Sequence, residues 1–261
     1  MINRRSAREI ENMRQAGAIV AEVLALCRDL ARPEVTTERL NREADALIRE
    51  RKGIPLFKGY RGYPKSICTS VNDEVVHGIP GPRILKAGDI LSVDVGVRLG
   101  GYCADAAITV PVGDISEEAA RLMDVCRESL ERAIRTLKPG MRLATLSGAV
   151  QEYVESHRCS VVRDYTGHGI GREMHEDPQV PNFVSSVTQD RVLPSGTVLA
   201  IEPMVNAGAA AVRKLDNGWT VVTEDHSLSA HFEHTVAIME SGPDVLTLPA
   251  GASRGSADQR N

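Results

Sequence analysis

Two aspartates in one largely apolar segment are the first residues whose spacing could do chemistry. Residues 91–110 alternate between two kinds of side chain around Gly100 and Gly101, which is a signal for a hairpin turn. With those glycines at the turn, Asp94 lies opposite Ala107, and Asp105 is its diagonal neighbour on the same face. Two close carboxylates repel each other unless a proton or a cation lies between them. The pair therefore either binds a cation or lies solvated on an exposed sheet face, and the register alone does not decide.

Three further residues could complete an oxygen-rich metal site. Glu202 ends an apolar run, and Glu233 also lies in a largely apolar segment. A carboxylate inside such a strand is costly unless it is paired or bound to a cation. His168 has a glycine on each side, which lets a partner approach closely. Asp94, Asp105, His168, Glu202 and Glu233 together would suit two hard or borderline divalent ions that share bridging carboxylates.

Four helices and a series of strands must position these side chains. Apolar spacing and capping residues predict helices from Ser6 to about Leu30, from Thr36 or Thr37 to a stop at Gly53, from Ser116 to Pro139-Gly140, and from about Thr145 to His157. The remaining chain has strand and turn patterns. Helices therefore arrive in pairs between strand-rich blocks, which is typical of an α+β fold.

A short internal similarity relates two parts of the chain. Residues 85–94 align with residues 193–202, and each copy consists of a turn, an apolar strand and a carboxylate at the same place. Each copy also follows a predicted helix pair. The alignment suggests two related halves that meet at Asp94 and Glu202.

Composition excludes several classes of protein. The 261 residues carry 31 Lys and Arg against 35 Asp and Glu, and this weakly negative charge predicts no general affinity for nucleic acid or membranes. No apolar run approaches the roughly 18 residues needed to span a bilayer. Five cysteines without CxxC spacing indicate neither a disulfide framework nor a zinc ribbon. We expect a cytoplasmic protein with a flexible polar tail at 251–261.

Several longer motifs resemble one enzyme family. They are Cys68-Thr69-Ser70-Val71-Asn72-Asp73-Glu74-Val75-Val76-His77-Gly78-Ile79-Pro80, Tyr165-Thr166-Gly167-His168-Gly169-Ile170-Gly171, His175-Glu176-Asp177-Pro178, Ile201-Glu202-Pro203-Met204 and Phe232-Glu233-His234-Thr235. In this order they resemble the type I methionine aminopeptidases, and the resemblance extends to about Leu248. It implies one pita-bread domain over residues 1–250, with two pseudo-symmetric halves and a curved antiparallel sheet covered by helix pairs.

The resemblance also implies roles for individual residues. Asp94, Asp105, His168, Glu202 and Glu233 would bind two divalent ions, which could be cobalt, manganese, iron or zinc, with Asp94 and Glu233 as bridges. Glu202 would act as the general base toward a metal-activated water, with His77 and His175 contacting substrate and transition state. The pocket for the methionine side chain would include Tyr60, Tyr63, Cys68, Met174 and Trp219, with Phe183 as a candidate neighbour.

The implied substrates are nascent polypeptides with methionine first and a small second residue. That role implies a transient ribosome contact, although no sequence motif indicates one, and we expect a monomer. Three residues depart from the usual family pattern. Met174 replaces a phenylalanine, Ala106 follows Asp105 in place of a hydroxyl residue that could bond its carboxylate, and His231 replaces a glutamine.

Two alternatives stay open at this point. The first is a pita-bread peptidase of the prolidase or Xaa-Pro aminopeptidase type, although those relatives usually carry a long extra N-terminal domain. The second is a catalytically silent pita-bread protein that binds ribosomes, RNA or a protein partner. Such proteins typically lose metal ligands, whereas all five candidate positions here are Asp, His or Glu.

Overall fold

The helices of the computed structural model lie close to their predicted positions. Within residues 2–186 and 189–249, which the structure describes, the α-helices are α1 (Ala7–Leu30), α2 (Thr37–Glu50), α3 (Glu117–Thr136) and α4 (Leu143–Ser156). The predicted capping box is present, because the Ser6 side chain accepts from the Glu9 amide while the Glu9 carboxylate accepts from the Ser6 amide. Helix α4 begins two residues before its predicted start, and its N-cap Arg142 makes no side-chain capping bond that the sequence could have signalled. The tail predicted at 251–261 lies outside the described residues.

The strands of the described chain are short apart from one long hairpin. They are β1 (Ile54–Pro55), β2 (Cys68–Val71), β3 (Glu74–Val76), β4 (Ile90–Leu99), β5 (Tyr102–Pro111), β6 (Ser160–Val161), β7 (Gly167–Gly169), β8 (Glu176–Val180), β9 (Val198–Ile201), β10 (Met204–Asn206), β11 (Val212–Lys214), β12 (Val221–Thr223), β13 (Ser229–His231), β14 (His234–Met239) and β15 (Gly242–Val245). Strand β4 pairs with β1, β2 and β5, and a five-stranded sheet has the order β15-β14-β9-β7-β8. Two three-stranded sheets, β13-β10-β6 and β11-β12-β3, complete the pairing.

The long hairpin has the predicted register. Asp94 pairs with Ala107, and Leu99 pairs with Tyr102 across the turn. Gly100 and Gly101 adopt φ values of 58° and 83°, the left-handed conformation that a tight hairpin turn requires. The valines of β4 and the alanines Ala104 and Ala106 of β5 are fully buried on the opposite face from the aspartates.

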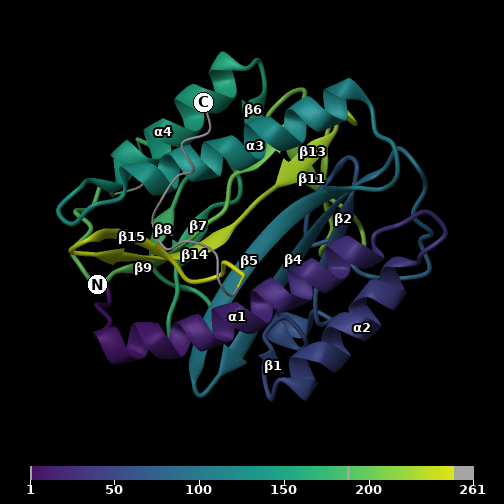
Figure 1. Cartoon of the computed structure of the whole chain (residues 1–261). Helices are drawn as coiled ribbons and strands as arrows, with labels where there is room; N and C mark the ends of the chain where they lie inside the picture. Colours follow the sequence, from purple (N-terminus) through teal and green to yellow (C-terminus); the bar gives the residue numbers. More distant parts are fainter. Residues whose placement is uncertain (1, 187–188, 250–261) are drawn as a thin grey trace, which may run out of the picture.

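Each helix pair covers its own apolar core. Helices α1 and α2 pack on the hairpin and β2, while α3 and α4 pack on residues from β6, β9, β10, β13 and β14. In Figure 1 the α3–α4 pair runs across the top of the view and the α1–α2 pair across the bottom, with strands visible between them. The α+β arrangement of helix pairs on antiparallel sheets is confirmed.

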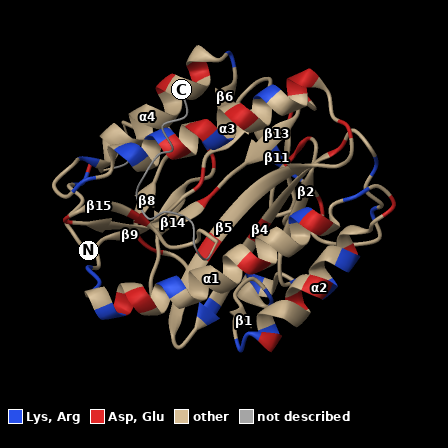
Figure 2. Ribbon diagram, viewed as in Figure 1, with Lys and Arg blue, Asp and Glu red and all other residues tan. Residues whose placement is uncertain are grey.

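Charged residues are concentrated on the helices. Figure 2 shows basic and acidic segments interspersed along the helices, whereas β4 and β5 are mostly uncharged. Among the described residues, no helix is both long and apolar enough to cross a membrane.

Candidate metal centre and substrate pocket

One cavity of 670 Å³ brings the predicted site residues together. Its wall includes Glu202, His77, His175, Asp94, Asp105, His168, Glu233, Tyr60, Tyr63, Cys68, Met174 and Trp219. These twelve are all the residues that the sequence analysis assigns to metal binding, catalysis or substrate binding. Their individual roles stay predictions, but their spatial convergence is a property of the fold.

Backbone pairing between the two halves places three of the carboxylates. Ala107 of β5 pairs with Asp94 of β4 on one side and forms a β-bridge with Glu233 on the other. Asp94, Ala107 and Glu233 therefore form one row across the junction of the halves. The Thr235 hydroxyl holds the backbone of the third carboxylate residue, Asp105. It accepts from the Asp105 amide at 2.9 Å and donates to the Asp105 carbonyl at 2.7 Å.

A histidine from the second half lies within ligand distance of these acids. One ligand atom each of Asp105, His168 and Glu233 lie within 4.8 Å of one another. His168 Nδ1 lies 2.9 Å from the Gly169 carbonyl. Donation to that carbonyl leaves Nε2 free to bind a metal. Nε2 is 3.6 Å from Glu202 Oε1, so Glu202 borders the same cluster.

Crowding and burial oppose ionisation of the four carboxyl groups. Burial raises the pKa of Asp105 to about 7. Burial and the neighbouring Asp105 also raise the pKa values of Asp94, Glu202 and Glu233 well above their ordinary range. A divalent cation would stabilise the ionised carboxylates that this environment otherwise disfavours.

The donor atoms fit such a cation. Asp94 Oδ1, Asp105 Oδ1 and Glu233 Oε1 are buried and have no hydrogen-bond partner among the residues that the structure describes. Asp105 is only 4% exposed, and Asp94 Oδ1 is also buried. The alternative of two solvated aspartates on an exposed sheet face is therefore wrong. Carboxylate oxygens with one imidazole form a donor set that suits iron, manganese, cobalt or zinc.

An apolar pocket adjoins the acidic cluster. Phe57, Tyr63, Cys68 and Met174 form one buried group, against which Trp219 packs. The Tyr63 and Trp219 rings meet edge to face with centroids 5.0 Å apart. The Tyr63 hydroxyl donates to main-chain carbonyls, including that of Gly78 at 2.9 Å. The polar tip of Tyr63 is thus satisfied, and its ring contributes an apolar wall.

His77 and His175 lie between the apolar pocket and the acids. His175 Nδ1 lies 3.0 Å from the Tyr60 hydroxyl, and the His175 ring is 4.3 Å from the His168 ring. Burial lowers the pKa of His77 to about 4, with a further contribution from Lys214. Burial and Arg61 also lower the pKa of His175. Both histidines are therefore neutral near pH 7, and each ring has one N–H donor.

The structure adds residues to the cavity that sequence reasoning missed. Phe57, Tyr165, Arg61 and Lys214 also line it. Tyr165 begins the Tyr165–Gly171 motif that contains His168, and this motif could have indicated that Tyr165 lies at the site. Its ring meets the His77 ring edge to face, with centroids 5.6 Å apart. The other three have no motif that distinguishes them. Phe183, the candidate neighbour, is not among the lining residues and instead packs against the core below α3 and α4.

The three departures from the family pattern have different surroundings. Met174 is 5% exposed and fills part of the apolar pocket. His231 Nε2 lies 3.7 Å from Glu202 Oε2, so this substitution does bear on the acidic cluster. Ala106 lies in the core beneath α1 and α2, on the opposite face of β5 from the Asp105 side chain. A hydroxyl at position 106 would therefore face the helices. The prediction that Ala106 removes a hydrogen bond from the Asp105 carboxylate is wrong.

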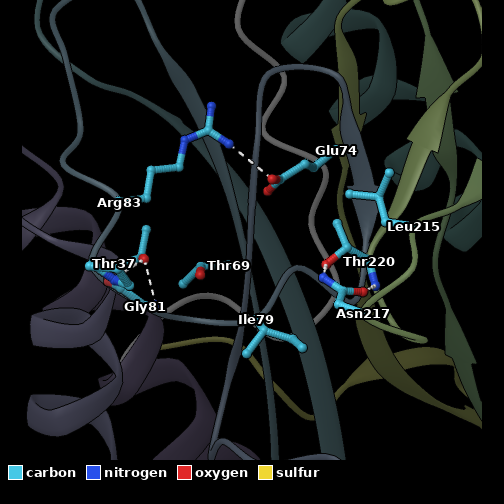
Figure 3. A pocket seen from close by; sticks show the side chains of 10 residues that line it. Thr37, Thr69, Glu74, Ile79, Gly81, Arg83, Leu215, Asn217 and Thr220 are labelled. Carbon is cyan, nitrogen blue, oxygen red and sulfur yellow. Dashed lines mark hydrogen bonds and ion pairs between the residues drawn. The ribbon is translucent and has the colours of Figure 1, made fainter.

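A second cavity lies behind the wall of the first. Figure 3 shows its lining, which includes Thr69, Thr220 and the ion pair between Glu74 and Arg83. Thr69 directly follows Cys68, and Thr220 directly follows Trp219. Neighbouring residues of the same two chain segments therefore line both this cavity of 460 Å³ and the candidate substrate pocket.

Comparisons with known proteins identify the family of this chain. Residues 11–240 match the model of metallopeptidase family M24. A methionine aminopeptidase of Clostridium acetobutylicum is 54% identical over 241 residues, covering 92% of this chain and 96% of that protein. The crystal structure of a methionine aminopeptidase from Thermotoga maritima superposes with a TM-score of 0.92 at 46% identity, covering 95% of this chain and all of that one. The chain therefore belongs to metallopeptidase family M24 and, within it, to the methionine aminopeptidases, which are hydrolases.

The same comparisons bear on the fold and on the first alternative. A prolidase from Pyrococcus horikoshii superposes with a TM-score of 0.73 at 19% identity, covering 94% of this chain but 63% of that one. This likeness shows a shared fold alone, and it confirms the pita-bread architecture. The much higher identity to methionine aminopeptidases favours that family over the prolidase type.

Proposed function

We propose that the protein removes N-terminal methionine from polypeptides whose second residue is small, using two divalent metal ions. The observation that carries this proposal is one cavity in which a buried Asp/Glu/His cluster adjoins a pocket of apolar side chains. The cluster suits metal-assisted hydrolysis, and the pocket suits an unbranched apolar side chain. The names of the relatives support the same activity.

Asp94, Asp105, His168, Glu202 and Glu233 would hold the ions. When bound, such ions polarise the scissile carbonyl and make water a nucleophile near neutral pH. The unpartnered buried oxygens of Asp94, Asp105 and Glu233 support this assignment.

Glu202 is the proposed general base. Its carboxylate lies between His168 and His231, at 3.6 Å and 3.7 Å from their Nε2 atoms. Burial and the neighbouring Asp105 both raise the pKa of Glu202, which favours proton uptake by its carboxylate. Glu202 would take the proton of the attacking water and pass it to the departing amine. His77 or His175, neutral near pH 7, would donate an N–H to the oxygen of the tetrahedral intermediate.

The cellular setting completes the proposal. Nascent polypeptides in the cytoplasm would be the substrates, met through transient contact with the ribosome. We further propose that residues 1–250 form one catalytic domain that acts as a monomer.

The test removes all metal and restores manganese, cobalt, iron or zinc singly. Each form is assayed by mass spectrometry on Met-Ala-Ser, Met-Glu-Ser, Ala-Pro-Ser and acetylated Met-Ala-Ser. Metal-dependent loss of methionine from Met-Ala-Ser alone is expected. Glu202→Gln should abolish it, whereas Glu240→Gln, on an exposed loop, should not. Cleavage of Ala-Pro-Ser would favour a prolidase-type activity, and inactivity with every metal despite tight metal binding would favour the silent binding protein.

A further inference from the structure

Two cationic side chains at the mouth of the catalytic cavity have no acidic partner in the described part of the chain. Arg61 and Lys214 both line the cavity and both belong to exposed residues, so they lie at its entrance. Within the described residues, neither forms an ion pair. The other charges of this rim are engaged, since Glu176 pairs with Arg5 and Asp177 lies 3.6 Å from Arg191. Arg61 and Lys214 are thus the rim charges left for a ligand.

The two cations flank the two histidines from different elements. The Arg61 guanidinium lies 5.4 Å from the centroid of the Tyr60 ring, and the Tyr60 hydroxyl contacts His175. Lys214 of β11 pairs with Val221, which pairs with Val76, the residue before His77. Arg61 therefore lies on the His175 side of the entrance and Lys214 on the His77 side. The lowering of both histidine pKa values by these cations agrees with this placement.

A substrate must leave the cavity through this entrance. If the first side chain occupies the apolar pocket and the scissile carbonyl lies at the histidines, as the proposed function requires, the chain beyond the second residue passes outward. An extended chain advances about 3.3–3.6 Å per residue, so the third residue lies about 7 Å beyond the first. Long Arg and Lys side chains at the rim can reach that position.

We propose that Arg61 and Lys214 form a carboxylate-binding subsite that recognises an acidic side chain at the third residue of the substrate. This inference rests on the proposed function. With two divalent ions bound, the four buried carboxylates of the metal centre are balanced by four positive charges. The unpaired charge that an emerging peptide meets is then that of Arg61 and Lys214.

The test compares C-terminally amidated peptides that differ only at one position: Met-Ala-Asp-Gly-Gly-Trp, Met-Ala-Asn-Gly-Gly-Trp and Met-Ala-Lys-Gly-Gly-Trp. Exposed ion pairs contribute little each, so two cations should raise kcat/KM for the Asp peptide about two- to tenfold over the Asn peptide. The Lys peptide should fall below the Asn peptide. Salt at about 0.5 M should remove most of the difference, because it screens exposed charges.

The double variant Arg61→Gln/Lys214→Gln should bring the Asp-to-Asn ratio close to one. Loss of the two cations also changes the pKa values of His77 and His175. Because that change affects the cleavage of both peptides equally, it cancels in the ratio of their kcat/KM values. The control Lys86→Gln/Arg213→Gln removes the same charges from exposed positions outside the cavity, and it should keep the wild-type ratio. Arg213 precedes Lys214 on β11, so this control also tests for damage to that strand.

Three outcomes would overturn the subsite. The Asp and Asn peptides could be cleaved equally, the control could lose the preference as fully as the double variant, or Asp could act equally well at the fifth position. The last result would indicate long-range steering without a subsite. Failure to cleave any peptide in the series, Met-Ala-Asn-Gly-Gly-Trp included, would instead count against the proposed aminopeptidase activity itself.

Discussion

Adding one methyl group at Gly17 should destabilise the protein, although alanine is the better helix former. Gly17 lies in α1, the helix that covers the hairpin carrying Asp94 and Asp105. A Cβ atom at this position would lie 2.2 Å from the Leu246 carbonyl oxygen, 2.8 Å from its carbon and 3.4 Å from Thr247 Cγ2. Ordinary non-bonded contacts need about 3.5–4.0 Å between carbons, so the chain at 246–247 must move by on the order of 1 Å.

The two opposing contributions differ in size. Replacing Gly by Ala in a helix interior gains about 1 kcal/mol of stability. Overpacking of a well-packed interior costs about 1–3 kcal/mol. Because the obstructing atoms are backbone and cannot rotate away, we place the cost near the upper end. Gly17→Ala should therefore lower the free energy of unfolding by about 1–2 kcal/mol.

Gly148 of α4 provides the matched control. A Cβ atom there would meet Val184 Cγ2 at 3.6 Å and Glu152 Oε1 at 4.0 Å, which are ordinary contacts. Gly148→Ala should therefore raise the free energy of unfolding by about 0.5–1 kcal/mol. Urea denaturation of both variants measures the two changes. If both shift stability in the same direction, then the close approach of Leu246 to α1 does not limit stability and the reasoning fails.

Three other perturbations have defined outcomes. Contacts with Arg49 and Ser66 hold the pKa of Asp45 at about 2, below its unfolded value, so its contribution is present above about pH 4 and lost as the pH falls toward 2. After discounting for the exposed Arg49, Asp45→Asn should destabilise by about 1 kcal/mol at pH 7 and by progressively less at lower pH, as urea denaturation would measure. Burial raises the pKa of the Cys68 thiol well above its usual range, so Cys68→Ser should keep activity within about tenfold, and Cys68 should resist iodoacetamide at pH 7 in mass spectrometry. Asp105→Asn should weaken metal binding by at least about tenfold, measured as metal retained after dialysis, and undiminished retention would count against its assignment as a ligand.

The sequence predicts the local architecture well because the relevant signals are local. Capping residues and apolar spacing locate the helices, and the two glycines fix the hairpin register that aligns Asp94 with Ala107. The sequence does not locate the start of α4 correctly, because the N-cap Arg142 makes no side-chain capping bond. The periodicity also places Gly17 on the buried face of α1, but it says nothing about the carbonyl of Leu246 that occupies the space beside it.

The candidate site is less predictable because its walls come from distant segments. The family resemblance brings together the twelve assigned residues. No short pattern places Phe57 and Arg61, which lie outside the strands, or Lys214 at the end of β11, at this cavity. Arg61 itself adopts a left-handed conformation with φ of 48°, which a sequence without a glycine at that place gives no reason to expect.

The junction between the halves explains how short strands can hold four carboxylates in place. Two threonine hydroxyls act in the same way from opposite sides. Thr235 bonds both the amide and the carbonyl of Asp105, and Thr109 bonds the amide and the carbonyl of His231 at 2.9 Å and 2.8 Å. Between them, the Glu233 amide donates to the Ala107 carbonyl at 2.9 Å. Each half thus fixes backbone next to the other half's acidic residue, and the buried hydroxyls are themselves fully bonded. These backbone contacts hold acidic residues from both halves close together, as a cation shared between the halves would require.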